Sequence, residues 1–201
     1  EITTNSAKTV HGLLINDAKV ISNCKVSGKI TVNGTTSRTY KVGGLCGELS
    51  IKDFEISNCR SNVTVELLAS ETSEVSGLTV GGLVGEISSV GSIKNGSAYF
   101  RLMDDGVNLY RSSAGGLIGY SVCYDKVSVS QSSAAVDINL TAIHCLTGGI
   151  AAMSKNIDIV NCYATGAITA SGRNINPQSQ CMSGGIAAGI GEIGGDQTGN
   201  I

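Results

Sequence analysis

The sequence contains no tryptophan, few tyrosine and phenylalanine residues, and a single proline. Its 201 residues include 6 Tyr and 2 Phe, so a core has to be built from small aliphatic side chains in thin layers. Neither sign of charge is in excess, because 14 basic and 16 acidic residues give a net charge of −2. Proteins that bind nucleic acid or anionic membranes carry a basic excess. We therefore expect no nucleic-acid partner and no general affinity for membranes.

Long hydrophobic runs are also missing. No stretch approaches the roughly 20 apolar residues that cross a bilayer, and the first residues do not have the pattern of a signal peptide. We expect no direct membrane insertion by this part of the chain. Residues 184–189 resemble the opening of another repeat, so we expect the parent protein to continue past Ile201.

Glycine, in contrast, is abundant, with 27 residues, and much of it recurs in one short motif. The clear copies are Gly43-Gly44-Leu45-Cys46-Gly47, Gly81-Gly82-Leu83-Val84-Gly85 and Gly115-Gly116-Leu117-Ile118-Gly119. Weaker copies are Gly148-Gly149-Ile150-Ala151-Ala152, Gly184-Gly185-Ile186-Ala187-Ala188 and a degenerate first copy, His11-Gly12-Leu13-Leu14-Ile15. The second positions lie 32, 38, 34, 33 and 36 residues apart, which indicates a repeat unit of about 35 residues.

A second element follows each motif, and it centres on an amide side chain. The amides are Asn23, Asn58, Asn95, Gln131 and Asn161. After each of them apolar or small residues alternate with polar residues, as in Ser61, Val63, Val65 and Leu67. A period of two over this length is typical of a half-buried β-strand, and no segment has the three-and-four spacing of a helix.

In-register repetition of such strands predicts an all-β parallel solenoid, a right-handed β-helix of about six coils of roughly 35 residues. Residues 1–201 then form a single repeat domain. Each strand stacks on its equivalent in the next coil at a spacing of about 4.8 Å. Three short strands do not use 35 residues, so we expect the surplus in loops such as 69–77 and 173–180.

Equivalent residues of successive coils form columns, and each column predicts a packing role. The aliphatic column of Leu13, Leu45, Leu83, Leu117, Ile150 and Ile186 should point inward. Two residues on, the small residues of Gly47, Gly85 and their equivalents should let another wall approach. The apolar column directly after the Leu column should point outward, under a loop or another strand. The glycine pair should form a corner through positive φ or close backbone contact. The amide column should sit in left-handed corners and stack as a ladder.

These motifs resemble a known family. The segment Gly81–Gly85, together with Asn161-Cys162-Tyr163-Ala164-Thr165-Gly166, is similar to the GLUG motif of bacterial surface proteins. The resemblance extends from about His11 to Gly189, and Ala replaces the closing Gly in the later copies. That family occurs in large adhesin-like proteins and in the non-catalytic part of some immunoglobulin A1 metalloproteases. The resemblance implies an exported, extracellular, surface-attached repeat region with no catalytic residues.

Metal chemistry has little support in the sequence. The two histidines, His11 and His144, fall in non-equivalent positions several coils apart, and no His-Glu-x-x-His segment occurs. No Cys-x-x-Cys spacing occurs among the seven cysteines. Cys24, Cys59 and Cys162 share one column, but side chains in register point the same way, so we expect free buried thiols. We expect no metal and no cofactor.

An enzyme of the polysaccharide-cleaving kind would need paired carboxylates on one outer face. Asp104 and Asp105 are typical of a turn with Gly106. Asp137 faces outward in a column with Lys29, Thr64, Arg101 and Ala167, which contains no second acid. We therefore predict a protein that is not an enzyme, and keep the polysaccharide-degrading alternative as the weaker one.

Two functions remain. The first is an adhesion or binding module that presents an outer face to a protein or glycan of a host or neighbouring cell. Its ligand-face candidates are Arg60, Tyr99, Arg101 and Tyr163, which are aromatic or basic and face outward on the alternating strand. The second is a structural stalk that holds another domain away from the cell.

Overall fold

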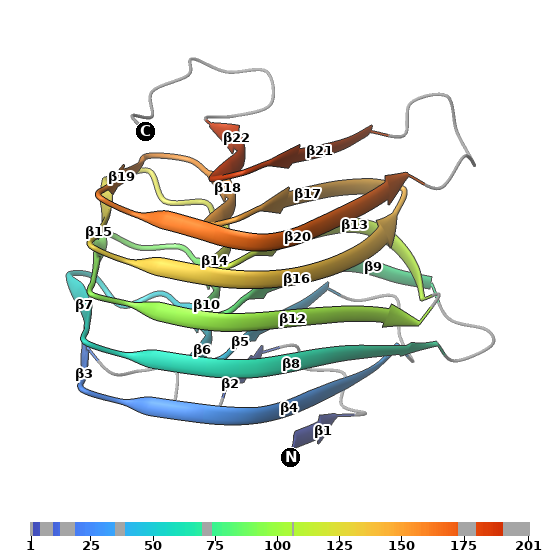
Figure 1. The fold of residues 1–201 in the computed structure, drawn as a ribbon, viewed down its shortest axis with the longest axis horizontal. Coiled ribbons are helices and arrows are strands. Elements are labelled where there is room, and N and C mark those ends of the chain that lie inside the picture. The colour runs from blue at the N-terminus through green and yellow to red at the C-terminus, as the bar shows by residue number, and fades with distance from the viewer. Residues whose placement is uncertain are drawn as a thin grey trace.

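The computed structural model describes residues 2–4, 10–12, 19–34, 39–69, 74–105, 107–172 and 180–190. All regular secondary structure in these residues is β-strand, and every strand pair is parallel. The strands stack in layers from the N-terminal to the C-terminal end (Figure 1). The chain is therefore a β-solenoid, as the repeats predicted.

Four parallel sheets form the walls of the solenoid. Sheet A has the longest strands, namely β1 (Ile2–Thr4), β4 (Lys25–Gly34), β8 (Arg60–Ala69), β12 (Ser97–Asp105), β16 (Ser133–Ala142) and β20 (Tyr163–Gly172). Sheet B consists of β2 (Val10–Gly12), β5 (Thr39–Gly43), β9 (Glu74–Gly81), β13 (Asn108–Gly115), β17 (His144–Gly148) and β21 (Gln180–Gly184).

The two other sheets have shorter strands. Sheet C consists of β3 (Val20–Ser22), β7 (Phe54–Ser57), β11 (Gly91–Lys94), β15 (Val127–Ser130) and β19 (Ile157–Val160). Sheet D consists of β6 (Cys46–Leu49), β10 (Val84–Ile87), β14 (Ile118–Ser121), β18 (Ala151–Ser154) and β22 (Ala187–Ile190). Each turn runs through sheets B, D, C and A in that order.

The number of turns and the strands per turn differ from the prediction. The described residues complete about four turns, from β5 to β20, so six coils are not confirmed. Each turn has four strands where three were assumed. The fourth strand takes up residues assigned to a loop, since β8 extends to Ala69 and β9 begins at Glu74. Of the predicted loops 69–77 and 173–180, residues 70–73 and 173–179 lie outside the described residues, and the others are strand residues.

The glycine motif sets the register of sheets B and D. Gly43, Gly81, Gly115, Gly148 and Gly184 pair directly from coil to coil, as predicted. The first copy is wrong by one residue, because Gly12 pairs with Gly43 and not with the second glycine of that pair. His11 consequently lies opposite Val42, in a column without glycine. Leu13 is outside the described residues. A single degenerate motif could not distinguish two alignments that differ by one step.

The aliphatic column points inward as predicted. Leu45, Leu83, Leu117 and Ile150 are fully buried in one continuous core. The next column was expected to face outward, and that prediction is wrong. Cys46, Val84, Ile118 and Ala151 are fully buried in the same core. Each residue of the first column is the second residue of a two-residue bend that ends where the next strand begins, so strict alternation does not carry across the corner.

Close backbone contact explains the glycines on both sides of this corner. A Cβ on Gly85 would lie 2.7 Å from the Val42 nitrogen, and one on Gly119 would lie 2.6 Å from the Val80 oxygen. Those backbone atoms belong to sheet B of the preceding coil. The prediction that small residues let another wall approach is confirmed, and sheets B and D meet at a distance that admits almost no side chain.

The amide column occupies left-handed corners, as predicted. Its φ angles are 56° at Asn23, 53° at Asn58, 51° at Asn95, 50° at Gln131 and 53° at Asn161. The side-chain amide of Asn58 donates to Asn23 at 3.3 Å, and that of Asn95 donates to Asn58 at 3.0 Å. The ladder therefore links successive coils at the corner between sheets C and A.

The position after each amide also has a role that the sequence did not indicate. In most coils this side chain donates to the carbonyl two residues earlier, as Cys59 does to Ser57 at 3.3 Å and Ser132 does to Ser130 at 2.8 Å. A thiol and a hydroxyl are both small donors, which explains why Ser132 can stand in a column of cysteines. In the coil where Gly96 stands, its amide donates to Ser132 at 3.0 Å.

Substitution at Asn58 tests the corner. We expect Asn58→Ala to lower the free energy of unfolding by about 1–2 kcal/mol, because Ala is strained at positive φ and the ladder bonds are lost. Asn58→Gly should cost less than Asn58→Ala, because glycine adopts this φ without strain. Urea unfolding followed by circular dichroism measures both. Equal losses in the two variants would contradict the conformational explanation.

Candidate functional site

The four predicted ligand-face residues share the outer face of sheet A. Tyr99 and Tyr163 have 55% and 64% of their surface exposed, and Arg60 and Arg101 are also exposed. Pairing in register places Ser97 beside Arg60, so Tyr99 and Arg101 follow along β12 next to β8. Tyr163 lies two strands further on, on β20. The structure therefore brings three of the four candidates together and leaves Tyr163 apart.

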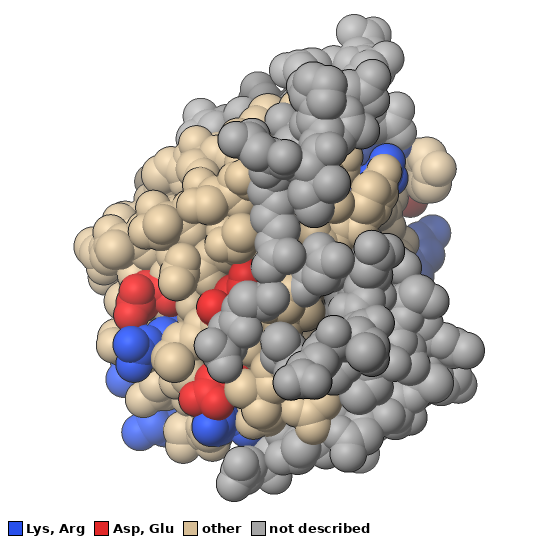
Figure 2. Space-filling model, turned by 90° about the vertical axis from the view of Figure 1, so that its right-hand side faces the viewer, with Lys and Arg blue, Asp and Glu red and all other residues tan. Residues whose placement is uncertain are grey.

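Charged groups on this face are mostly neutralised within it. Arg101 Nε lies 3.1 Å from the Asp137 carboxylate, and Lys29 Nζ lies 2.6 Å from Glu66. Figure 2 shows charged side chains at its lower left, over the N-terminal coils, and others at its right edge, but none at its upper left. In the described residues after Asp158, no Asp, Glu, Lys or Arg occurs. The outer face of sheet A thus changes from charged on β4, β8 and β12 to uncharged on β20.

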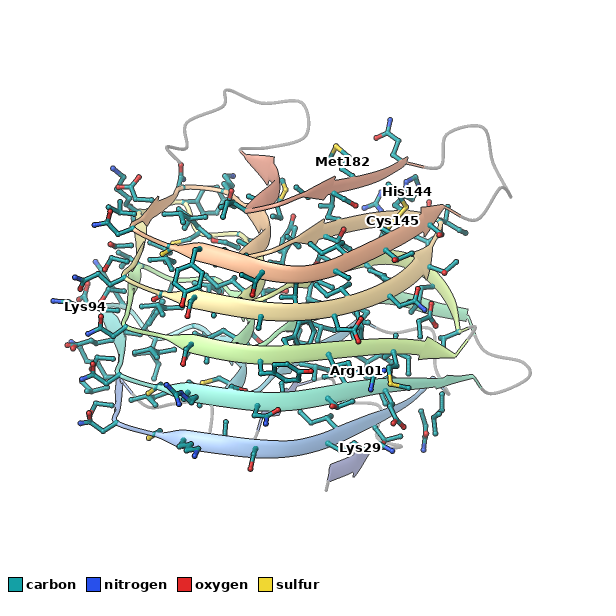
Figure 3. All side chains as sticks on the ribbon, viewed as in Figure 1. Lys29, Lys94, Arg101, His144, Cys145 and Met182 are labelled. Atoms are coloured by element: carbon teal, nitrogen blue, oxygen red, sulfur yellow. A yellow bond between two sulfur atoms is a disulfide. The ribbon has the colours of Figure 1, made fainter. Side chains whose placement is uncertain are left out.

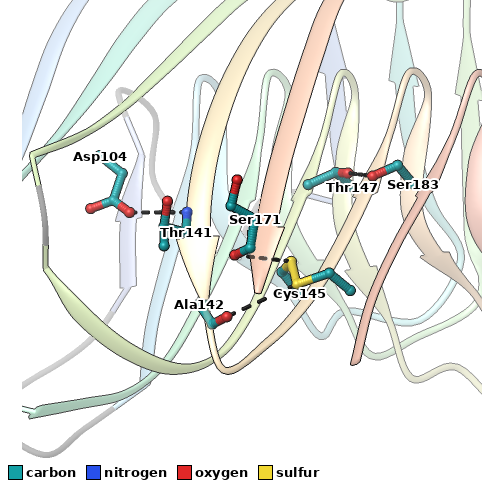
Figure 4. The surroundings of a disulfide bond; sticks show 8 residues. Asp104, Thr141, Ala142, Cys145, Thr147, Ser171 and Ser183 are labelled. Atoms are coloured by element: carbon teal, nitrogen blue, oxygen red, sulfur yellow. Dashed lines mark hydrogen bonds between the residues drawn. A yellow bond between two sulfur atoms is a disulfide. The ribbon is translucent and has the colours of Figure 1, made fainter. Parts of the chain in front are cut away.

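The predicted acidic residues have structural contacts. Asp137 occupies the column with Lys29, Thr64, Arg101 and Ala167 that alternation predicted. Asp104 and Asp105 are the last two residues of β12 and not turn residues as predicted, and Gly106 lies outside the described residues. Asp104 accepts hydrogen bonds from the Val107 and Thr141 amides at 3.0 Å each. Figure 4 shows the second of these bonds.

The cysteines correct the expectation of free thiols throughout. Cys145 on β17 and Cys181 on β21 form a disulfide between adjacent coils (Figure 4). The two residues pair in register with Cα atoms 4.5 Å apart, which is within disulfide range. The expectation of free thiols, which rested on poor bridging geometry between side chains in register, is therefore wrong for this pair. Cys24, Cys46, Cys59, Cys123 and Cys162 are free, as expected.

A groove lies on the outer side of the corner between sheets B and D, and the sequence did not predict it. The glycine columns allow the two sheets to meet closely there, so their outer faces form two walls with a crease between them. The groove has a volume of about 760 Å³. Sheet B contributes Thr79, Arg111, His144, Leu146 and Met182 to one wall, among others. Opposite stand residues of sheet D and the segments after its strands, including Glu86, Tyr120, Tyr124, Met153 and Lys155.

Its N-terminal end is closed by an ion-pair network. Lys41 Nζ lies 2.9 Å from Glu48 and 2.9 Å from Glu86, so the ammonium bridges sheets B and D. Burial acts to lower the pKa of Lys41, but hydrogen bonds and attraction from Glu86 and Glu48 outweigh it and raise the pKa above its usual value. Lys41 therefore stays charged at neutral pH and ties the two walls together.

Further along, the column of sheet B that begins at Lys41 becomes apolar. Register pairing aligns Lys41, Thr79, Ser113, Leu146 and Met182 from coil to coil, so polar side chains give way to apolar ones. Figure 3 shows His144 and Met182 on neighbouring strands at the C-terminal end, away from Lys29 and Arg101 on sheet A.

Several large side chains of the groove are exposed to solvent and do not belong to the hydrophobic core. Tyr124 is 86% exposed and Met182 is 37% exposed. Arg111 is exposed and stacks over the ring of Tyr110 at 5.7 Å, and that ring also meets His144 edge-on. Arg111 and His144 pair in register. Only the angle between sheets B and D brings these residues opposite Tyr124, which is why alternation along single strands could not reveal the site.

Within the described ranges, no group of three or more His, Cys, Asp or Glu residues is placed to hold a metal ion. In the same part of the chain, no helix is long and apolar enough to span a membrane. Comparison of the chain with family models, with curated proteins and with solved structures found no match.

Proposed function

We propose that this chain is a non-enzymatic binding module of an exported bacterial cell-surface protein, and that it docks a protein or glycan of another cell in the groove between sheets B and D. The observation that carries the proposal is the set of exposed side chains along a concave surface, Arg111, Tyr124 and Met182 above all. Solenoids commonly bind partners through extended concave surfaces. Exposed aromatic and Arg side chains are also the commonest binding anchors.

Three further points support an extracellular location and a non-enzymatic function. The Cys145–Cys181 disulfide suits an oxidising compartment outside the cytoplasm. Asp137 is paired with Arg101, and Asp104 is held by two backbone amides, so these carboxylates already have structural partners. The resemblance to the GLUG motif supports the same placement on the cell surface.

Binding assays with paired variants test the proposal. The wild-type chain is screened against arrays of glycans and of surface proteins, and each hit is measured by biolayer interferometry. We expect Arg111→Ala with Tyr124→Ala to weaken a genuine hit by at least about tenfold, the loss typical of removing anchor residues. The matched variant on sheet A, Arg60→Ala with Tyr99→Ala, should change affinity by less than about twofold.

The controls separate the competing functions. Equal thermal midpoints of the two double variants exclude loss of fold as the cause. A hit that is lost only in the sheet A variant would move the site to the flat face and contradict the groove. No hit for the wild-type chain would favour the structural stalk. Shortened products after incubation with polysaccharides would favour the enzyme and overturn the proposal.

A further inference from the structure

The Cys145–Cys181 disulfide shows that two cysteines in register on successive coils can bridge. A second pair of cysteines has the same relation. Cys24 and Cys59 stand at the same corner of successive coils, between the register pairs Ser22 with Ser57 and Lys25 with Arg60. The Arg60 amide donates to the Cys24 carbonyl at 2.8 Å, so the two backbones adjoin at this point.

Hydrogen bonds also place both thiols at this corner. Burial is the main cause that raises the pKa of the Cys59 thiol. Each thiol also donates to a carbonyl of the same corner, Cys24 to Ser22 at 3.3 Å and Cys59 to Ile21 at 3.5 Å. The Cys59 thiol therefore points toward the coil that carries Cys24, and both thiols donate to neighbouring carbonyls of that coil.

We propose that Cys24 and Cys59 form a second disulfide between coils when the protein meets a low-molecular-weight disulfide. The Cys145–Cys181 disulfide lies near the C-terminal end of the described stack, and the Cys24–Cys59 disulfide would be a second covalent link between coils, or staple, near its N-terminal end. End coils are where a solenoid opens first, because each has a neighbour on one side only.

The reaction is a thiol–disulfide exchange. The Cys24 thiolate attacks one sulfur of the oxidant and releases the first small thiol, which leaves a mixed disulfide on Cys24. The Cys59 thiol then loses its proton and attacks the Cys24 sulfur, releasing the second small thiol. One small disulfide is reduced to two thiols, and two cysteines are oxidised to one cystine.

Cys46 is the competing partner, because it lies close enough to both thiols for their charges to raise its pKa. Burial is the main cause of that shift, which takes the pKa of Cys46 to about 12, so almost no thiolate forms there. Cys46 is fully buried, whereas Cys24 is partly exposed. The oxidant therefore reaches Cys24 first, and Cys59 is the neighbour that resolves the mixed disulfide.

Counting thiols by alkylation and intact mass tests the proposal. The folded chain is treated with the oxidant and is then unfolded without reductant before alkylation, so that buried thiols are counted as well. The sequence has seven cysteines and one disulfide joins two of them, so five thiols should react before treatment (7 − 2 = 5). Treatment with oxidised glutathione should leave three (5 − 2 = 3), with Cys24 and Cys59 in one cross-linked peptide. Closure of the staple should raise Tm by roughly 5–10 °C.

Matched variants identify the pair. Cys46→Ser should still lose two thiols on treatment, whereas Cys24→Ser should lose none to an internal disulfide. A chain with both Cys145→Ser and Cys181→Ser should also lose two, which separates the new staple from the known one. A thiol count that does not fall, glutathione retained on Cys24, or a cross-link through Cys46 would each overturn the proposal.

Discussion

Gly82→Ala should lower the free energy of unfolding by more than about 3 kcal/mol, or prevent folding altogether. A Cβ at this position would lie 2.1 Å from the Gly116 oxygen and 2.7 Å from the Ala98 Cβ. The first is a backbone atom of the next coil, which cannot move without breaking the stack. Thermal unfolding followed by circular dichroism, together with the yield of soluble protein, measures the loss.

The chain provides a matched control for this substitution. Gly185 is the equivalent of Gly82 in the last described coil, and a Cβ there meets no atom of the described residues within 4 Å. Gly185→Ala should therefore change the free energy of unfolding by less than about 0.5 kcal/mol. Similar losses in both variants would mean that the glycine is needed for its backbone conformation, and the explanation by close contact would be wrong.

Phe100→Ala should have an effect of similar size, about 3–5 kcal/mol, for a different reason. Phe100 is fully buried and is one of only two phenylalanines in the chain. It fills the middle of a column whose other members are the smaller Gly28, Val63, Val136 and Gly166. In a core of thin aliphatic layers, no neighbour is large enough to occupy the space that the ring leaves.

Tyr99→Ala is the control for Phe100, because the adjacent side chain points to the opposite face and is 55% exposed. It should change the free energy of unfolding by less than about 0.5 kcal/mol. Urea unfolding of the three proteins makes the comparison. If removal of the two rings costs the same, alternation across sheet A does not separate core from surface as described.

Local patterns predicted much of this architecture. Period-two alternation identified the inner and outer columns of sheet A, down to the alignment of Asp137 with Arg101. Repetition of the amide column predicted left-handed corners and the ladder between Asn58 and Asn95. Both succeed for the same reason. Stacking on neighbouring coils imposes the same packing requirement at every repeat, so the same residue pattern occurs several times in one chain.

Predictions from the sequence failed where they depended on a single copy of the motif or on a change in the direction of the chain. The first motif was misaligned by one residue because Gly12 has no second glycine beside it to mark the register. Cys46 was expected to face outward, because alternation was continued across the bend at Leu45. The spacing of residues in the sequence identifies the coil to which a residue belongs, but it does not determine the angle through which the chain turns at a corner.

Part of the candidate site could be predicted from the sequence, and part could not. Sequence alone was sufficient to place Arg60, Tyr99 and Arg101 on one outer face, because strand alternation is a property of consecutive residues. The groove and the Cys145–Cys181 bridge required the tertiary structure. The groove depends on the angle between two walls, and the bridge depends on the Cα separation of two stacked strands. Both quantities arise only when the coils close on one another.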